Sequence, residues 1–207
     1  MANVKDDDTS PLAAALPAFQ KQQPLSDDRL TAAQKGSAHH CFLEHLDPAR
    51  ASDMSQLRSE LERIRNLGWI SEAEAKAIDL NAILKFWQSD LGAEIIKNKD
   101  CMRPELNFTA GFTPKEMADI TGKYALMEGE ELIILQGAVD LAVILPEEIW
   151  IVDFKTDQVT PEQLPEKART YEVQLRLYAA ALGKIYNRKT TKASLYFLKL
   201  GEAAKII

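Results

Sequence analysis

The chain has 207 residues, of which 46% are hydrophobic and 27% are charged, a composition typical of one ordinary domain with its own core. Its net charge of −6 argues mildly against nucleic-acid binding driven by bulk charge, although a site built from carboxylates with a local basic strip stays open. The two cysteines, Cys41 and Cys101, exclude a disulfide framework and lack the paired spacing of a zinc or iron–sulfur site, so we expect a cytoplasmic protein.

The first part of the chain changes from an irregular segment to helices. Residues 1–28 are rich in Asp, Pro, Ala and Gln without sustained periodicity, which indicates a flexible tail or linker. A helix is expected from Ser26 or Asp27, either of which is a suitable cap, to about Leu46. The hydrophobic pattern predicts further helices at 54–66, 71–77 and 79–96, the second of them with a capping box formed by Ser71 and Glu74. Residues 29–100 are therefore predicted to be mainly helical.

After Asp100 the pattern becomes typical of an α/β structure. An extended segment at 103–112 is followed by two β-rich runs, 131–144 and 148–156, and the Pro-Glu-Glu turn between them predicts a hairpin. The chain ends with a long helix that begins near Pro165 and a strand at 192–200. These elements predict that residues 101–207 form a mixed sheet flanked by helices.

No segment predicts a contact with a membrane. The longest apolar run, residues 132–145, is shorter than the about 20 residues that a bilayer requires, and Gln136 and Asp140 interrupt it. The first ten residues are acidic and lack the apolar stretch of a signal peptide.

The predicted hairpin carries the first candidate site. Asp140 and Asp153 lie inside adjacent strands, which are about 4.8 Å apart, so their carboxylates can converge on one cation. Lys155 projects from the same side of its strand as Asp153. A divalent cation held by such carboxylates supports phosphodiester hydrolysis, and the ammonium group can orient water or neutralise developing charge. The alternative is a structural Asp–Lys ion pair that bridges two strands.

Other polar residues in apolar surroundings have both a functional and a structural interpretation. Gln174 and Tyr178 share one face of the long helix, as a site pair or as a core tyrosine with a peripheral glutamine. His40, beside His39 on the first helix, is either a metal ligand or a packed histidine. Glu105, in the extended segment, is either part of the site or a solvated strand residue.

Five short motifs resemble the nuclease domain of the RecB and AddA helicase–nucleases, which belongs to the PD-(D/E)XK superfamily. They follow one another along the chain in the same order as in that family. The resemblance covers roughly residues 30–200, and each motif alone is weak. The Gly-Thr-x-x-His motif of that family matches Gly36, Ser37 and His40, with Ser in place of Thr, and its Asp-Tyr-Lys-Thr matches residues 153–156, with Phe in place of Tyr. The remaining matches are Glu105 with Phe108, Gly137 with Asp140, and Gln174 with Tyr178.

The resemblance implies a restriction-endonuclease-like fold that spans residues 29–207, helical over 29–100 with a catalytic core over 101–207. It implies a site for Mg²⁺ or Mn²⁺ with the ligands His40, Asp140, Asp153 and the backbone carbonyl of Phe154. Lys155 would be catalytic, Glu105 would lie behind the metal or ligate it transiently, and Gln174 and Tyr178 would position DNA. Because Cys41 and Cys101 do not supply the four cysteines of the iron–sulfur branch, no iron–sulfur cluster is expected.

The activity implied is an exonuclease-like DNase that works with a helicase, in cis or in trans, in double-strand-break processing. The sequence contains no Gly-Lys-Thr/Ser phosphate loop, so this chain does not carry the helicase motifs itself. A non-catalytic module of the same fold that binds DNA or a helicase is the main alternative, and a nuclease that acts on RNA is a third. A basic cluster at Lys184, Arg188, Lys189 and Lys192 either tracks a DNA backbone or marks a solvated helix end.

Overall fold

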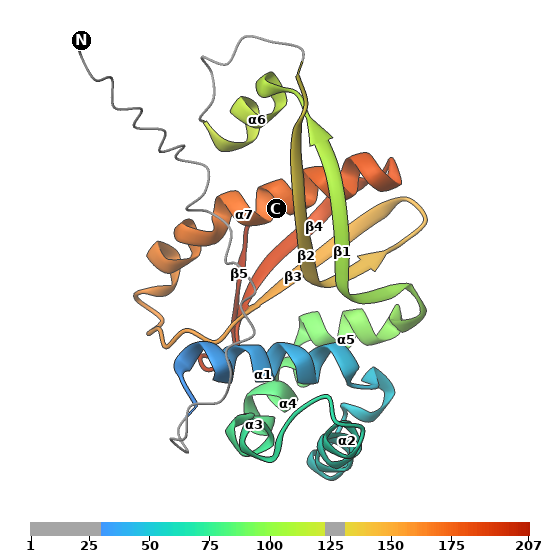
Figure 1. The fold of residues 1–207 in the computed structure, drawn as a ribbon, viewed down its shortest axis with the longest axis vertical. Coiled ribbons are helices and arrows are strands. Elements are labelled where there is room, and N and C mark those ends of the chain that lie inside the picture. The colour runs from blue at the N-terminus through green and yellow to red at the C-terminus, as the bar shows by residue number, and fades with distance from the viewer. Residues whose placement is uncertain (1–29, 123–130) are drawn as a thin grey trace, which may run out of the picture.

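A five-stranded mixed sheet forms the centre of the computed structural model, which describes residues 30–122 and 131–207 (Figure 1). Its strands follow the order β1-β2-β3-β4-β5, and only β3 and β4 are parallel. The predicted α/β class, with a mainly helical N-terminal half, is confirmed. The segment 1–28, interpreted as a tail, lies outside the described residues.

The strands include the predicted hairpin and one further strand at the end of the chain that the sequence did not predict. Their bounds are β1 Met102–Phe112, β2 Ile133–Ile144, β3 Glu148–Lys155, β4 Lys189–Phe197 and β5 Glu202–Lys205. The hairpin is confirmed as β2 and β3, and the Leu145 amide donates to the Glu148 carbonyl to close its turn. The predicted strand at 192–200 starts too late and ends too late, because the chain turns after Phe197 and returns as the unpredicted β5.

The helices differ from the sequence prediction at three places. They are α1 Ala32–His45, α2 Met54–Asn66, α3 Glu72–Ala77, α4 Leu80–Gln88, α5 Asp90–Lys97, α6 Pro114–Thr121 and α7 Leu164–Tyr186, with short 3₁₀ turns η2 Pro48–Arg50 and η3 Lys99–Cys101. The first helix begins at Ala32 and not at Ser26 or Asp27, which lie outside the described residues, because Thr31 and Gln34 form a capping box. The capping box of Ser71 and Glu74 is confirmed. Helix α6 is absent from the sequence prediction, although Thr113 and Glu116 cap it in the same way.

The predicted helix at 79–96 is two helices, α4 and α5, that meet at Ser89. The Ser89 hydroxyl donates to the Phe86 carbonyl and also accepts from the Gly92 amide, so this residue ends one helix and begins the next. A Cβ on Gly92 would lie 2.2 Å from the Phe86 carbonyl oxygen. The close approach at Gly92 permits the sharp bend, which a pattern of apolar residues alone does not reveal.

Each face of the sheet carries its own apolar core. One core joins α1–α5 to strand residues that include Trp150, Val152 and Phe154, and the other joins α7 to residues that include Ile149 and Ile151. Figure 1 shows α1–α5 gathered at one end of the sheet and α7 lying across it. Because side chains alternate along β3, Asp153 and Lys155 belong to the α7 side. Within the described residues, no helix has the length and apolar character needed to cross a membrane.

Glu60 is a fully buried carboxylate that connects α2 to the segment after α1. It accepts hydrogen bonds from the Asp47 amide at 3.1 Å and from Arg50 Nη1 at 2.8 Å. Arg63 Nη2 donates to it at 2.6 Å and also donates to the His45 carbonyl at the end of α1. This network fixes the C-terminal end of the helix that carries His40.

We expect Glu60→Gln to lower the free energy of unfolding by about 2 kcal/mol, because removing one member of a buried ionic network leaves its partners poorly compensated. The effect stays below that of a fully enclosed pair, since Arg50 and Arg63 are 49% and 39% exposed. Urea denaturation of both proteins measures the difference. The matched control is Glu62→Gln, whose exposed ion pair with Arg65 contributes less than about 1 kcal/mol.

The acid dependence of this effect has a defined sign. The Arg63 hydrogen bonds hold the pKa of Glu60 below its ordinary value of 4.5. A lowered pKa in the folded state stabilises the protein above the ordinary value, and this contribution is lost as the pH falls through the folded-state value. The gap between wild type and Glu60→Gln should therefore narrow in acid, and equal losses for Glu60→Gln and Glu62→Gln at neutral pH would contradict the assignment.

Candidate active site

Asp153 and Lys155 form a close ion pair at the end of β3. Asp153 is 2% exposed, and its Oδ2 lies 2.6 Å from Lys155 Nζ. The structural ion pair left open by the sequence is therefore present. Lys155 nevertheless has further contacts, because Nζ donates to Gln174 Oε1 at 3.4 Å and lies 4.1 Å from the centre of the Tyr171 ring. The ammonium group thus lies between β3 and α7, on the side that carries the other candidate residues.

Asp140 is fixed to β3 by a side-chain hydrogen bond. The described β2–β3 ladder ends at the pair Leu141–Val152, and beyond it the Phe154 amide donates to Asp140 Oδ2 at 2.7 Å. The N–H and C=O of one strand residue point to the same side, so the Phe154 carbonyl also faces β2. This orientation is compatible with the ligand role expected for that carbonyl.

His40, Glu105 and Asp140 bring their side chains together from α1, β1 and β2. His40 Nδ1 lies 3.2 Å from Asp140 Oδ1 and 4.0 Å from Glu105 Oε1. One ligand atom from each residue lies within 4.8 Å of the other two. The family resemblance implies His40, Asp140 and Asp153 as direct ligands with Glu105 behind them, whereas among the described residues the tight group contains Glu105 and not Asp153.

His39 has a different role from its neighbour. It is buried, its Nδ1 lies 2.7 Å from the Lys35 carbonyl, and its Nε2 accepts from the Asp79 amide at 2.9 Å. Burial lowers the pKa of His39, which favours the neutral ring that this pair of contacts requires. Since both nitrogens are engaged, His39 fastens α1 to the start of α4, and His40 is the histidine that faces the carboxylates.

Glu105 occupies a strained position on β1. Its φ of 43° is in the left-handed region, which is uncommon for a residue other than glycine. The register passes from Pro104–Leu141 to Leu106–Val139, so Glu105 stands opposite Asp140 without a regular ladder pair. Backbone strain of this kind is costly and is concentrated at functional sites. No feature of the sequence around Glu105 reveals this conformation.

The carboxylates of the group are partly or fully buried and lie close together, which raises the pKa of Glu105 and of Asp153. Burial, reinforced by the charge of Asp140, raises the pKa of Glu105 to about 7. Burial and Asp140 also raise the pKa of Asp153, against the opposing effect of Lys155. Burial lowers the pKa of His40, but the hydrogen bond and charge of Asp140 outweigh it and the pKa is raised. Carboxylate oxygens with one imidazole suit a divalent cation such as Mn²⁺ or Mg²⁺, so the donor set fits the expected metal.

Gln174 and Tyr178 extend the site along α7. Gln174 Nε2 donates to Tyr178 Oη at 2.8 Å, so a continuous chain of contacts runs from Asp153 through Lys155 and Gln174 to Tyr178. The predicted common face of these helix residues is confirmed. Tyr178 also packs edge-to-face on Phe108, with ring centres 5.3 Å apart.

Two glycines of the motifs have a steric reason. A Cβ on Gly137 would lie 3.0 Å from the Phe108 ring and 3.3 Å from the Tyr178 ring, so the aromatic pair requires a residue without a side chain beneath it. A Cβ on Gly36 would lie 3.1 Å from Thr156 Oγ1, so this glycine lets α1 approach the end of β3 closely. Each glycine therefore brings elements together around the site.

A groove of about 520 Å³ lies on the β1–β2 ribbon. It is lined by Asn107, Phe108, Thr109, Gln136 and Gly137. Gln136 Nε2 donates to Thr109 Oγ1, so the polar lining is partly pre-organised. The sequence does not reveal Asn107, Thr109 or Gln136 as site residues, because alternating polar residues are ordinary on an exposed strand.

The basic cluster near the end of α7 is largely engaged within the chain. Lys184 donates to the Gly111 carbonyl and pairs with Glu116, and Arg188 donates to the Leu145 carbonyl. Lys192 pairs with Glu94 and lies over the Trp150 ring. The contacts of Lys184, Arg188 and Lys192 connect neighbouring elements of the chain and weaken the DNA-tracking interpretation.

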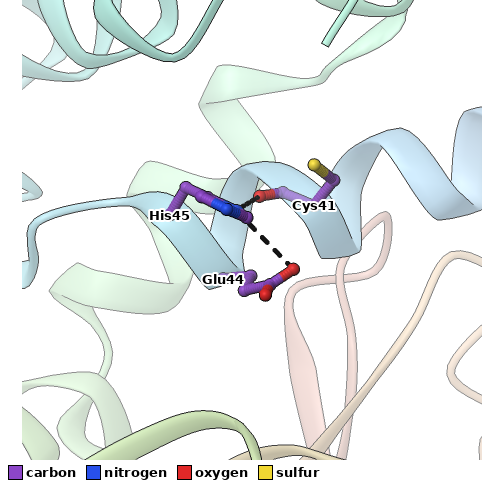
Figure 2. Close-up of side chains that lie close together, drawn as sticks. All are labelled: Cys41, Glu44 and His45. Atoms are coloured by element: carbon purple, nitrogen blue, oxygen red, sulfur yellow. Dashed lines mark hydrogen bonds and ion pairs between the residues drawn. The ribbon is translucent and has the colours of Figure 1, made fainter. Parts of the chain in front are cut away.

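A second group that combines a thiol, a carboxylate and an imidazole lies at the end of α1, and Figure 2 shows it. His45 Nδ1 lies 3.0 Å from the Cys41 carbonyl and 3.6 Å from Glu44 Oε2. The Cys41 thiol donates to the Trp69 carbonyl, and the His45 ring packs on the Trp69 ring. Because the ring nitrogen and the thiol are both engaged within the chain, we assign this group to the packing of α1 against the α2–α3 turn.

Comparison with known proteins gives the context of this site. A family model described as the PD-(D/E)XK nuclease superfamily matches residues 9–206. The chain is 30% identical over 181 residues to an ATP-dependent helicase/nuclease subunit of Moorella thermoacetica, and the alignment covers 87% of this chain and 12% of that protein.

Two further relatives carry the same name and show the same proportions. The protein of Syntrophomonas wolfei is 28% identical over 191 residues, which cover 92% of this chain and 15% of the relative. The protein of Geobacillus thermodenitrificans is 28% identical over 197 residues, which cover 92% of this chain and 16% of the relative. The chain thus corresponds to only a small part of the curated relatives that it matches.

Proposed function

Because the chain belongs to the PD-(D/E)XK nuclease superfamily, we propose that it is a metal-dependent DNase that hydrolyses phosphodiester bonds in an exonuclease-like manner. The observation that carries this proposal is the convergence of His40, Glu105 and Asp140 beside the Asp153–Lys155 pair. Three carboxylates and one imidazole can hold a divalent cation that activates water, and one ammonium group can neutralise the charge that develops on the phosphate.

The carboxylates and His40 would hold Mg²⁺ or Mn²⁺, together with the Phe154 carbonyl. The cation would polarise the phosphate and lower the pKa of a nearby water molecule. Lys155 supplies a fixed positive charge at the same place, where it can orient the attacking water or neutralise charge that develops on the phosphate. Asp153 and Gln174 hold that ammonium group from two sides.

A groove on the β1–β2 ribbon, which also carries Glu105 and Asp140, offers a path for the substrate. Asn107, Thr109 and Gln136 offer neutral hydrogen-bonding groups along the β1–β2 ribbon. Such a surface suits a nucleic-acid strand, whose sugar and phosphate oxygens accept hydrogen bonds. Gln174 and Tyr178 would position the strand beside Lys155, which Gln174 contacts.

The relatives extend the proposal to a cellular role. Since they are named helicase/nuclease subunits and the chain matches 12–16% of their lengths, we assign it a role in double-strand-break processing with a RecB/AddA-type helicase, in cis or in trans. In this proposal residues 29–207 form the nuclease domain, residues 1–28 form a linker, and the protein acts in the cytoplasm without membrane or iron–sulfur partners.

Cleavage of end-labelled single-stranded DNA, double-stranded DNA and RNA of one sequence tests the proposal. We expect DNA cleavage with Mg²⁺ or Mn²⁺, none with EDTA, and little cleavage of RNA. Cleavage of RNA but not of DNA would contradict the proposed DNA substrate and would support a nuclease that acts on RNA. DNA binding without cleavage under every condition would support the alternative, a non-catalytic DNA- or helicase-binding module of the same fold.

A further inference from the structure

Tyr171 is a third contact of Lys155, in addition to Asp153 and Gln174. On α7, Tyr171 precedes Gln174 by three residues, so both side chains project from nearly the same face. Lys155 Nζ lies 4.1 Å from the centre of the Tyr171 ring, within the range of a cation–π interaction. Lys155 is therefore held by a carboxylate, an amide oxygen and an aromatic face.

The Tyr171 ring is itself fixed by the residue that follows the motif of β3. The Tyr171 hydroxyl donates to Asp157 Oδ2 at 3.0 Å, and Lys167 Nζ lies 2.8 Å from Asp157 Oδ1. Burial raises the pKa of Asp157, but the Lys167 and Tyr171 hydrogen bonds outweigh it and the pKa is lowered. Asp157 is therefore ionised at neutral pH and remains an acceptor for the hydroxyl.

The contacts of Asp157 with Tyr171 and Lys167 connect the end of β3 to α7. Asp157 lies two residues after Lys155, and both Lys167 and Tyr171 project from the first half of α7. These contacts fix the distance between the end of β3 and α7, and the Lys155 side chain lies between these two elements. The lysine side chain is flexible, so contacts that restrict its ammonium group keep it in one position. This matters because a misplaced catalytic group lowers the reaction rate.

We propose that Tyr171 is a positioning residue that seats the Lys155 ammonium group, with Asp157 as the anchor of its ring. The proposal rests on the proposed nuclease function, in which Lys155 acts at the phosphate. Tyr171 itself acts through Lys155 and needs no contact with the substrate.

Three substitutions separate the ring from its hydroxyl. Tyr171→Leu removes the aromatic face and should lower kcat about 10- to 100-fold with KM within about twofold, because the defect is in positioning. Tyr171→Phe keeps the face and should lose less than about fivefold, and Asp157→Asn should fall between the two. Tyr186→Leu makes the same change about four turns further along α7 and should leave kcat unchanged.

A spectroscopic measurement tests the seat without any cleavage. Lys155 Nζ lies over the Tyr171 ring, so we expect the adjacent side-chain methylene protons to be shifted upfield in the NMR spectrum. The signal is assigned by its absence from Lys155→Met. The shift should persist in Tyr171→Phe and Tyr186→Leu and disappear in Tyr171→Leu.

The two readouts separate the proposals. Loss of the shift in Tyr171→Leu together with an unchanged kcat would overturn the positioning role, and so would an unshifted signal in the wild type. A wild-type protein that cleaves no DNA would contradict the proposed function, whereas the NMR signal would still decide whether Tyr171 seats Lys155. A fall in kcat for Tyr186→Leu equal to that for Tyr171→Leu would also overturn the proposal, because it would assign the loss to the packing of α7.

Discussion

Replacing Lys155 with methionine should reduce metal-dependent DNA cleavage by about 10³-fold or more, because it removes a fixed positive charge from the place where charge develops. Methionine retains the unbranched apolar stem and its packing. The fold should survive the loss of the Lys155–Asp153 pair, because the raised pKa of Asp153 allows this carboxyl group to take up a proton. Initial rates on end-labelled DNA and thermal melting measure the two effects.

Lys184→Met is the matched control for this substitution. Lys184 is engaged with Glu116 and the Gly111 carbonyl, far along α7 from the site, so cleavage should stay within about twofold of the wild type. The same variant tests whether the basic cluster binds DNA, because removing a lysine that contacts the phosphates would weaken DNA binding. Cleavage by Lys155→Met at the wild-type rate would show that Lys155 is only the structural partner of Asp153.

Replacing Asp140 with asparagine should abolish cleavage and yet stabilise the metal-free protein. The charge of Asp140 contributes to the raised pKa of both Glu105 and Asp153, so a neutral amide relieves the crowding of like charges. The asparagine oxygen can still accept the Phe154 amide hydrogen bond that positions Asp140. We expect a gain of about 1 kcal/mol, or a melting temperature raised by about 2–4 °C.

The melting comparison needs a pH of about 8 and EDTA, where the loss of a partner for protonated His40 has little weight. Asp119→Asn, at an exposed position of α6, is the control and should leave both melting and cleavage unchanged. An Asp140→Asn protein that melts well below the wild type would argue that Asp140 is a structural residue, and one that still cleaves DNA would remove it from the site.

The residues of the site that the sequence could predict are those placed by simple periodicity. Alternation along a strand puts Asp153 and Lys155 on one face, and adjacency of the hairpin strands puts Asp140 beside them. The helical repeat puts Gln174 and Tyr178 together. These relations depend only on the type of element, and the structure confirms them.

The relations that the sequence could not predict depend on particular backbone conformations and on distant packing. Glu105 has a left-handed φ and its carboxylate lies in the group with His40 and Asp140, and no local sequence pattern signals this conformation. The bend at Ser89 results from a close approach at Gly92 that the apolar stripe conceals. The link from Asp157 to Tyr171 joins residues 14 positions apart and depends on how α7 returns to the sheet.

The same contacts answer whether Asp153 and Lys155 are an ion pair or part of a site. They are an ion pair at 2.6 Å, but Lys155 also contacts Gln174 and Tyr171. In addition, burial and the charge of Asp140 raise the pKa of Asp153. A pair with a structural role alone would not require the two further carboxylates, Glu105 and Asp140, beside it. We infer that the pair keeps the ammonium group in place beside the metal ligands.

Calorimetric titration with Mn²⁺ tests the central claim most directly, since the claim is that the carboxylates around His40 hold a divalent cation. We predict saturable binding of Mn²⁺ to the wild-type protein and to Asp119→Asn, and loss of that binding in Asp140→Asn. Absence of binding to the wild-type protein at millimolar Mn²⁺, or undiminished binding to Asp140→Asn, would contradict the claim.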